Sequence, residues 1–263
     1  MPGTPVVLVH GLWLHASSWD PWVELLTEKG YAPVAPGWPG EPPTVAEARA
    51  NPDVVAGLGI SAVTDHYAAL IETLPEKPIV IGHSFGGLIA EKLLGQGCAT
   101  ACVALSPAQF KGNLALPPTQ LKPAFPILSK PGLRSRSVIL DKDAWAAGFA
   151  NTVPRAEADA LWEAAAIPSP MRPLFQAALA NFALHSEATV DVHRQRGPVL
   201  VVGAGQDRTV PQATSRAAYK ILAKSPGVTE WAALPDRGHS FPVDSGWWTT
   251  ADLVLDFLSR NGL

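Results

Sequence analysis

The sequence has few cysteines, few charged residues and no long apolar run. Its two cysteines, Cys98 and Cys102, have no further metal-ligand residues clustered near them, so we expect two small core residues and no metal site. No stretch of 18 or more apolar residues occurs, which excludes a membrane-spanning helix of ordinary length. The short apolar stretch 6–9 has no positive region before it, as an export signal would, and together with the scarcity of cysteine this favours a cytoplasmic location.

Charged residues are also scarce, and neither sign strongly predominates. Charged residues make up 16% of the chain, below the usual value of about 25%, and the formal net charge is −3. Because no basic run could neutralise phosphate groups, we expect no nucleic-acid partner and no binding to an anionic membrane surface. The remaining partner class is a small-molecule substrate, bound by a monomer or a homodimer.

Apolar residues, by contrast, form several short runs that predict a buried sheet. Residues 6–9, 78–81 and 198–202 are continuous and rich in β-branched side chains, a pattern typical of parallel strands covered on both faces. Weaker strand patterns occur near 31–35, 101–105 and 228–233, and helical patterns follow the strands. Repeated strand–loop–helix units predict an α/β protein with about six mainly parallel strands flanked by helices.

The pattern changes between residues 107 and 196. Prolines are dense at first, and stretches rich in alanine and tryptophan with helical character follow near 141–150, 155–166 and 171–185. No convincing buried strand occurs there. The sequence therefore predicts an α/β core domain formed by residues 1–106 and 197–263, with a helical cap, or lid, inserted as residues 107–196.

The strongest chemical signal is the sequence Gly-His-Ser-Phe-Gly-Gly at residues 82–87, between a predicted strand and a predicted helix. A G-x-S-x-G turn in this context places its serine on a sharp bend with the hydroxyl outside the sheet. Glycines are needed on both sides because side chains there would collide with neighbouring backbone. We therefore predict that Ser84 is a catalytic nucleophile.

A serine hydroxyl needs a base, and the base needs a group that orients it. Of the seven histidines, His239 follows the last predicted strand, which puts it at the same edge of the sheet as Ser84. Asp207 follows the strand at 198–202 and is expected to orient His239. The order serine, acid, histidine is the one found in α/β-hydrolases.

An oxyanion formed during acyl transfer needs two backbone N–H donors. The amide of Phe85, directly after the nucleophile, is expected to supply one. The first loop, which begins His-Gly at residues 10–11, is expected to supply the other through Leu12, with Trp13 as the second choice.

These motifs, in this order, resemble the α/β-hydrolase superfamily over essentially the whole chain. The resemblance implies a nucleophile–acid–histidine triad and no cofactor. The two antiparallel strands that often open this fold are missing from the pattern, and in this respect the chain is similar to compact plant-type esterases and hydroxynitrile lyases.

The most direct functional hypothesis is hydrolysis of a carboxylic ester, lactone or thioester of small to medium apolar character. Serine at position 84 disfavours dehalogenases and epoxide hydrolases of this fold, which carry aspartate there. Ser240 stands where hydroxynitrile lyases of the family have lysine, which weakens a C–C lyase reading. Cofactor-free perhydrolase chemistry and a non-catalytic ligand-binding receptor remain alternatives. Five aromatic residues in loops or the insertion are candidates for the substrate pocket: Trp13, Phe110, Trp145, Trp162 and Phe241.

Overall fold

Six parallel strands form the central sheet of the computed structural model, which describes residues 3–115 and 125–263. Their order is β2-β1-β3-β4-β7-β8, and every neighbouring pair is parallel. The strands are β1 (Pro5–Val9), β2 (Ala32–Val34), β3 (Ile79–His83), β4 (Ala101–Leu105), β7 (Val199–Ala204) and β8 (Thr229–Leu234). The predicted six-stranded parallel sheet is confirmed.

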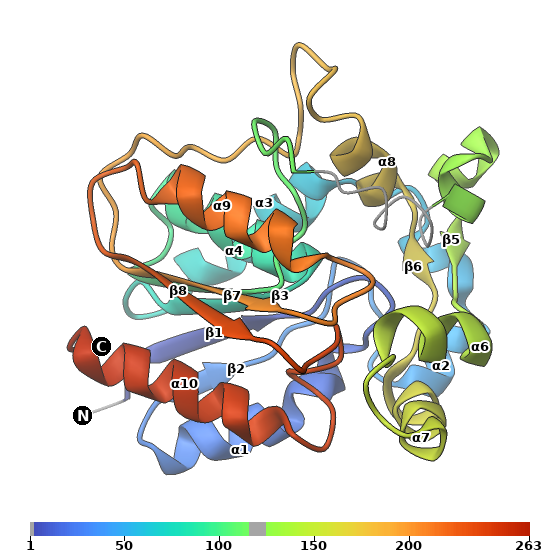
Figure 1. The fold of residues 1–263 in the computed structure, drawn as a ribbon, viewed down its shortest axis with the longest axis horizontal. Helices are drawn as coiled ribbons and strands as arrows, with labels where there is room; N and C mark the ends of the chain where they lie inside the picture. The colour runs from blue at the N-terminus through green and yellow to red at the C-terminus, as the bar shows by residue number, and fades with distance from the viewer. Residues whose placement is uncertain (1–2, 116–124) are drawn as a thin grey trace.

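Helices cover both faces of this sheet (Figure 1). One face carries α1 (Asp20–Glu28) and α10 (Trp247–Arg260), and the other carries α3 (Ile60–Glu72), α4 (Phe85–Gln96) and α9 (Gln212–Leu222). The side chains of β1 show why a central strand is a continuous apolar run in the sequence: both of its faces are covered. Val7 and Val9 pack into one hydrophobic cluster, while Val6 and Leu8 pack into the other on the opposite face.

The segment between β4 and β7, residues 106–198, is called here the insertion segment. Its described helices and short strands lie beyond the carboxyl ends of the sheet strands, and its last residues run back to the start of β7 (Figure 1). It contains a 3-10 helix (Pro131–Ser135), β5 (Ser137–Val138), α6 (Lys142–Ala144), a π-helical turn (Trp145–Phe149), α7 (Arg155–Ala165), β6 (Ser169–Pro170) and α8 (Arg172–Ala178). The short helix α2 (Val45–Ala50) and the 3-10 helices at Ala16–Trp19 and Pro52–Val55 lie in the connections between β1 and β3.

Two sequence expectations for the insertion segment were wrong. Strands β5 and β6 pair as an antiparallel ribbon, although no strand was expected there. Each has only two residues, which is too short to produce an alternating or continuous apolar pattern. The helix expected over residues 171–185 ends at Ala178, because the chain turns at residues 179–182. In the described residues, no helix combines the length and apolarity needed to cross a bilayer.

Candidate active site

Ser84 stands at the carboxyl end of β3 on a strained turn. Its backbone has φ 56° and ψ −120°, a conformation that L-residues rarely adopt. Neighbouring backbone holds it there: the Ser84 amide donates to the Leu105 carbonyl at 2.9 Å, and the Ala108 amide donates to the Ser84 carbonyl at 2.9 Å. Strain of this kind persists only where surrounding structure imposes it, and it is concentrated at functional sites.

The glycines on either side of Ser84 are required by the packing of this turn. A Cβ atom added to Gly82 would lie 2.0 Å from the Gly86 carbonyl oxygen, and one added to Gly86 would lie 2.0 Å from the Val9 carbonyl oxygen. Both distances are far below van der Waals contact. The G-x-S-x-G spacing therefore lets α4 begin directly against β1 and β3.

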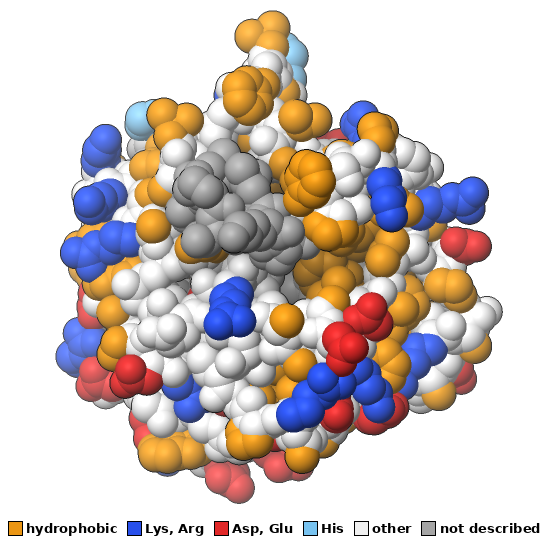
Figure 2. All heavy atoms as spheres, turned by 45° about the vertical axis from the view of Figure 1, so that its right-hand side comes forward, with side chains coloured by type: hydrophobic (Ala, Val, Ile, Leu, Met, Phe, Trp, Pro, Cys, Tyr) orange, Lys and Arg blue, Asp and Glu red, His pale blue; other side chains and the backbone are white. Residues whose placement is uncertain are grey.

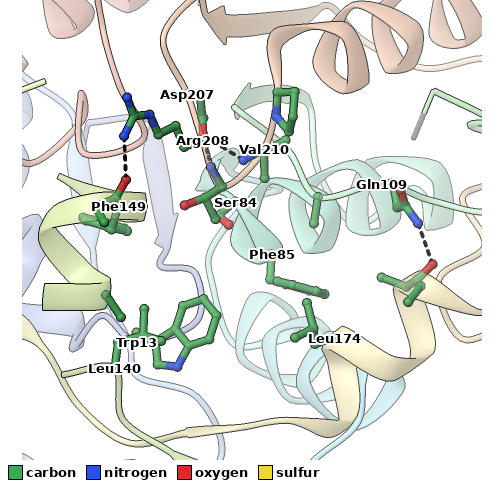
Figure 3. Close-up of a pocket in the computed structure, with 18 of the residues that line it drawn as sticks. Trp13, Ser84, Phe85, Gln109, Leu140, Phe149, Leu174, Asp207, Arg208 and Val210 are labelled. Atoms are coloured by element: carbon green, nitrogen blue, oxygen red, sulfur yellow. Dashed lines mark hydrogen bonds between the residues drawn. The ribbon is translucent and has the colours of Figure 1, made fainter. Parts of the chain in front are cut away.

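Asp207 and His239 come together from the loops that follow β7 and β8. The carboxylate oxygen Oδ2 of Asp207 lies 2.7 Å from Nδ1 of His239. The other oxygen, Oδ1, accepts hydrogen bonds from the amides of Thr209 at 2.8 Å and Val210 at 2.7 Å (Figure 3). Both side chains are buried. The carboxylate is thus fixed at both oxygens, and it can hold the imidazole in one orientation.

The His239 ring is enclosed by other rings. His83, the residue before Ser84, lies 4.5 Å from it between ring centroids, and Phe149 meets it edge-on at 5.3 Å. Burial, reinforced by the neighbouring His239, holds the pKa of His83 well below its usual value. His83 is therefore neutral, and its ring links the turn of Ser84 to the loop of His239.

Sequence reasoning missed the residue that braces the His239 loop. Asp244 accepts a hydrogen bond from the Ser240 hydroxyl at 2.8 Å and pairs with Arg237. Asp236, which lies closer to His239 in the sequence, is exposed. A carboxylate four residues after Ser240 carries no motif that would distinguish it in the sequence.

The first loop lies directly against Ser84. A Cβ atom added to Gly11 would be 2.7 Å from the Cβ atom of Ser84, so glycine is needed for this approach. The amides of Leu12 and Phe85 donate to no acceptor in residues 3–115 or 125–263. The Trp13 amide, the second choice from sequence, donates instead to the Ser169 hydroxyl. Two unused N–H groups near Ser84 are what an oxyanion hole requires.

Ser84 and Asp207 both border a cavity of about 850 Å³ (Figure 3). Its wall is mainly apolar and is built by the core and the insertion segment together. The apolar lining includes Trp13, Phe85, Leu128, Leu140, Phe149 and Leu174. Arg208, Thr209 and Gln212 supply polar groups on the β7 side. The face that the insertion segment forms also carries many apolar side chains (Figure 2). Cavities of this volume and character suit small to medium apolar molecules.

Of the five aromatic residues proposed for the pocket, the structure places only Trp13 in the cavity wall. Trp145 is fully buried and stacks on Phe149 at 4.0 Å between ring centroids. Phe110 and Phe241 are likewise buried in the hydrophobic clusters. Trp162 lies under the Arg49 guanidinium and donates from its indole to the Leu140 carbonyl. Phe110, Trp145 and Phe241 therefore pack the interior, and Trp162 is held at the edge of the insertion segment by its contacts with Arg49 and Leu140.

The sequence comparison with protein families decides the classification. A profile of the alpha/beta hydrolase family matches residues 6–249, nearly the full chain. The chain belongs to the alpha/beta hydrolase family. A search of curated proteins found no match.

Solved structures with the same fold cover this alpha/beta hydrolase almost end to end. A pyrethroid hydrolase from Sphingobium faniae is 19% identical with a TM-score of 0.66, and the match covers 97% of each chain. A methylesterase from Arabidopsis is 17% identical with a TM-score of 0.65, covering 98% of this chain and 99% of that one. A monoacylglycerol lipase from Paleococcus ferrophilus is 21% identical with a TM-score of 0.66, and the match covers 98% of this chain and 96% of the lipase. At these identities the likeness establishes the fold.

This alpha/beta hydrolase also carries a buried charge cluster beneath its first loop. His10 Nε2 lies 3.0 Å from Glu41 Oε2, and His10 Nδ1 donates to the Gly11 carbonyl at 2.9 Å. Burial disfavours the charged form of His10, but the Glu41 carboxylate outweighs burial and raises the pKa of His10 above its usual value. Burial likewise opposes ionisation of Glu41, yet His10 lowers the pKa of that carboxyl. The Glu41 carboxylate also accepts from the Ala16 amide at 2.9 Å, which ties both ends of the loop together.

Glu41→Gln is therefore expected to destabilise the protein in a pH-dependent way. Removing one partner of a buried ion pair typically costs about 3–5 kcal/mol. The pKa of His10 is raised in the folded protein. The stabilisation that its ion pair with Glu41 provides is therefore complete below about pH 6.5, the reference pKa of histidine, and is lost as the pH rises through the folded pKa. The difference in unfolding free energy between wild type and Glu41→Gln, measured with urea at pH 6 and pH 9.5, should be larger at pH 6. A difference that grows toward pH 9.5 would contradict a charged His10.

Proposed function

We propose that this protein is a serine hydrolase that cleaves carboxylic esters, with Ser84 as nucleophile, His239 as base and Asp207 as the group that orients the base. One observation carries the proposal: Asp207, whose carboxylate lies 2.7 Å from His239, shares the wall of an apolar cavity with Ser84, a serine held at positive φ. A strained serine, a carboxylate-bound histidine and free amides in one place have a direct use in acyl transfer.

The mechanism follows from the roles of these groups. Asp207 holds the proton of His239 on Nδ1, which leaves Nε2 free to accept the proton of the Ser84 hydroxyl as its oxygen attacks the ester carbonyl. The amides of Leu12 and Phe85 stabilise the negative oxygen of the tetrahedral intermediate. His239 then protonates the departing alcohol, and a water molecule repeats the sequence on the acyl-enzyme to release the acid.

The cavity supports an apolar substrate of small to medium size. Its volume of about 850 Å³ lies within the range of pockets that bind drug-sized molecules, and apolar side chains make up most of its wall. Two structural neighbours, a pyrethroid hydrolase and a methylesterase, are hydrolases by name, in line with this choice. We propose that residues 107–196 act as a cap that supplies part of this apolar wall.

The experiment that tests the proposal is hydrolysis of 4-nitrophenyl esters whose acyl chains run from two to ten carbons. We expect hydrolysis above buffer and a kcat/KM that rises from acetate to chains of middle length, because longer chains bury more apolar surface in the cavity. Heat-unfolded protein is the control for non-enzymatic release. Absence of hydrolysis across the series would remove the esterase proposal and favour a ligand-binding role for the cavity.

A C–C lyase role receives no support from the loop of His239. The position after His239 holds Ser240, whose hydroxyl donates to Asp244 and is buried. It carries no positive charge that could bind a cyanide leaving group. Ester hydrolysis therefore remains the function that the site supports best.

A further inference from the structure

The insertion segment is joined to the first loop by a short run of backbone hydrogen bonds. The His15 amide donates to the Ala165 carbonyl at 2.9 Å, and the Ile167 amide donates to the Trp13 carbonyl at 3.0 Å. Between these bonds, Leu14 pairs with Ala166 as an antiparallel bridge. The paired residues, 13–15 and 165–167, lie 150 or more positions apart in the sequence, so the contact is entirely tertiary. The loop that should donate to the oxyanion is thus one edge of a small ribbon whose other edge belongs to the insertion segment.

Trp13 is the strained point of that loop. Its φ is 65°, in the left-handed region, which costs a bulky L-residue about 1–2 kcal/mol. Three hydrogen bonds to the insertion segment hold it: the amide donates to the Ser169 hydroxyl, the carbonyl accepts from Ile167, and the indole donates to the Val138 carbonyl at 3.1 Å. The Trp13 amide is the only one of these three groups whose partner is a side chain, so it is the one that a point substitution removes.

Fixing the Trp13 amide also fixes its neighbour. The Leu12 carbonyl and the Trp13 N–H belong to one planar peptide unit, so the direction of that N–H sets the ψ angle of Leu12. On the other side of Leu12, Gly11 packs against the Cβ atom of Ser84. Leu12 is therefore held between Ser84 and Ser169, and the direction of its free amide depends on both.

We propose that Ser169 is a positioning residue that keeps the Leu12 amide aimed at the oxyanion, and that the insertion segment thereby forms part of the catalytic apparatus as well as of the cavity wall. This inference rests on the proposed hydrolase function. Ser169 is 4% exposed and lies on β6, which is paired with β5, so its hydroxyl is held at a fixed place without solvent competition. Without that hydroxyl, the buried Trp13 N–H has no partner and the positive φ loses one of its three supports.

Ser169→Ala is expected to lower kcat by about tenfold to a hundredfold on a 4-nitrophenyl ester. Loss of an entire oxyanion donor lowers kcat by a factor of about 10²–10³, and a misdirected donor lowers it less. KM should stay within about twofold, because the ester carbonyl gains full negative charge only in the transition state. The inhibition constant of a trifluoromethyl ketone, which forms a tetrahedral adduct with the serine, should rise by the same factor as kcat/KM falls.

One variant of a neighbouring serine and two further variants of Ser169 complete the test. Ser137→Ala is the matched control: it removes a serine hydroxyl from the other strand of the same ribbon, where it donates to the Pro52 carbonyl outside the first loop. It should retain wild-type kcat. Ser169→Thr keeps the hydroxyl and should restore most of kcat, and Ser169→Cys, nearly the same size but a weaker acceptor, should give an intermediate loss even if the alanine variant fails to fold.

Each result supports or overturns the inference. Equal kcat in Ser169→Cys, Ser169→Ala and Ser137→Ala would overturn it, as would a loss confined to KM with unchanged affinity for the ketone. If wild type itself hydrolyses no ester in the series, the proposed function fails and this inference falls with it. A hydrolase whose Ser169 variants match wild type would leave the proposed function standing and remove the positioning role alone.

Discussion

Replacing Ser84 with alanine is expected to lower kcat for ester hydrolysis by about 10⁶. Removing the nucleophile of a serine triad removes the covalent path altogether, and only binding and oxyanion stabilisation remain. Alanine has the same Cβ as serine, and the positive φ at this position is imposed by bonds to Leu105 and Ala108 that the substitution leaves intact. The measurement is kcat on the best 4-nitrophenyl ester, with thermal unfolding to show that the variant is folded.

Ser106→Ala provides a matched control for this variant. Ser106 is also a buried serine with positive φ at the end of a strand, but it is not part of the cavity wall. Its alanine variant should keep kcat within about tenfold of wild type, since a polar-to-apolar change near the core usually acts through stability. A Ser84→Ala enzyme as active as Ser106→Ala would mean that another group performs the attack.

Asp207→Asn is expected to lower kcat by about 10⁴. The amides of Thr209 and Val210 both donate to Oδ1, so the asparagine must turn its carbonyl oxygen toward them. Its NH₂ group then faces Nδ1 of His239, which has to accept, and the ring proton moves to Nε2. In that tautomer His239 cannot take the proton of Ser84. The structure thus predicts a large loss of kcat from a substitution that leaves the size and shape of the side chain almost unchanged.

Asp236→Asn tests whether the loss is specific to this carboxylate. Asp236 is exposed in the same loop as His239, and its variant should be indistinguishable from wild type in kcat. Loss of less than tenfold in Asp207→Asn, measured at the pH of highest activity, would assign the orienting role to another carboxylate.

Much of this site could be predicted from sequence because it depends on strand ends. Parallel strands bring their carboxyl ends to one edge of the sheet, so residues that follow β3, β7 and β8 had to meet there. The glycines around Ser84 carry the same kind of information, since the close approach of β1 and α4 leaves no space for a side chain. Local spacing and strand order were therefore enough to predict that Asp207 and His239 lie close together.

The parts that sequence reasoning missed depend on contacts between distant segments. Nothing near Ser169 in the sequence shows that its hydroxyl binds Trp13, 156 residues away. The same holds for Glu41 beneath the first loop and for Trp145, which packs on Phe149 rather than lining the cavity. In each case the partner is chosen by tertiary packing in the insertion segment or in a long loop, where neither periodicity nor a motif fixes the position of a side chain.

Reaction with a fluorophosphonate, followed by intact mass and peptide mapping, tests the central claim most directly. We expect one adduct per chain, on Ser84, formed quickly by wild type and not formed by Ser84→Ala. Modification at a different residue, or equal labelling of wild type and the alanine variant, would contradict it.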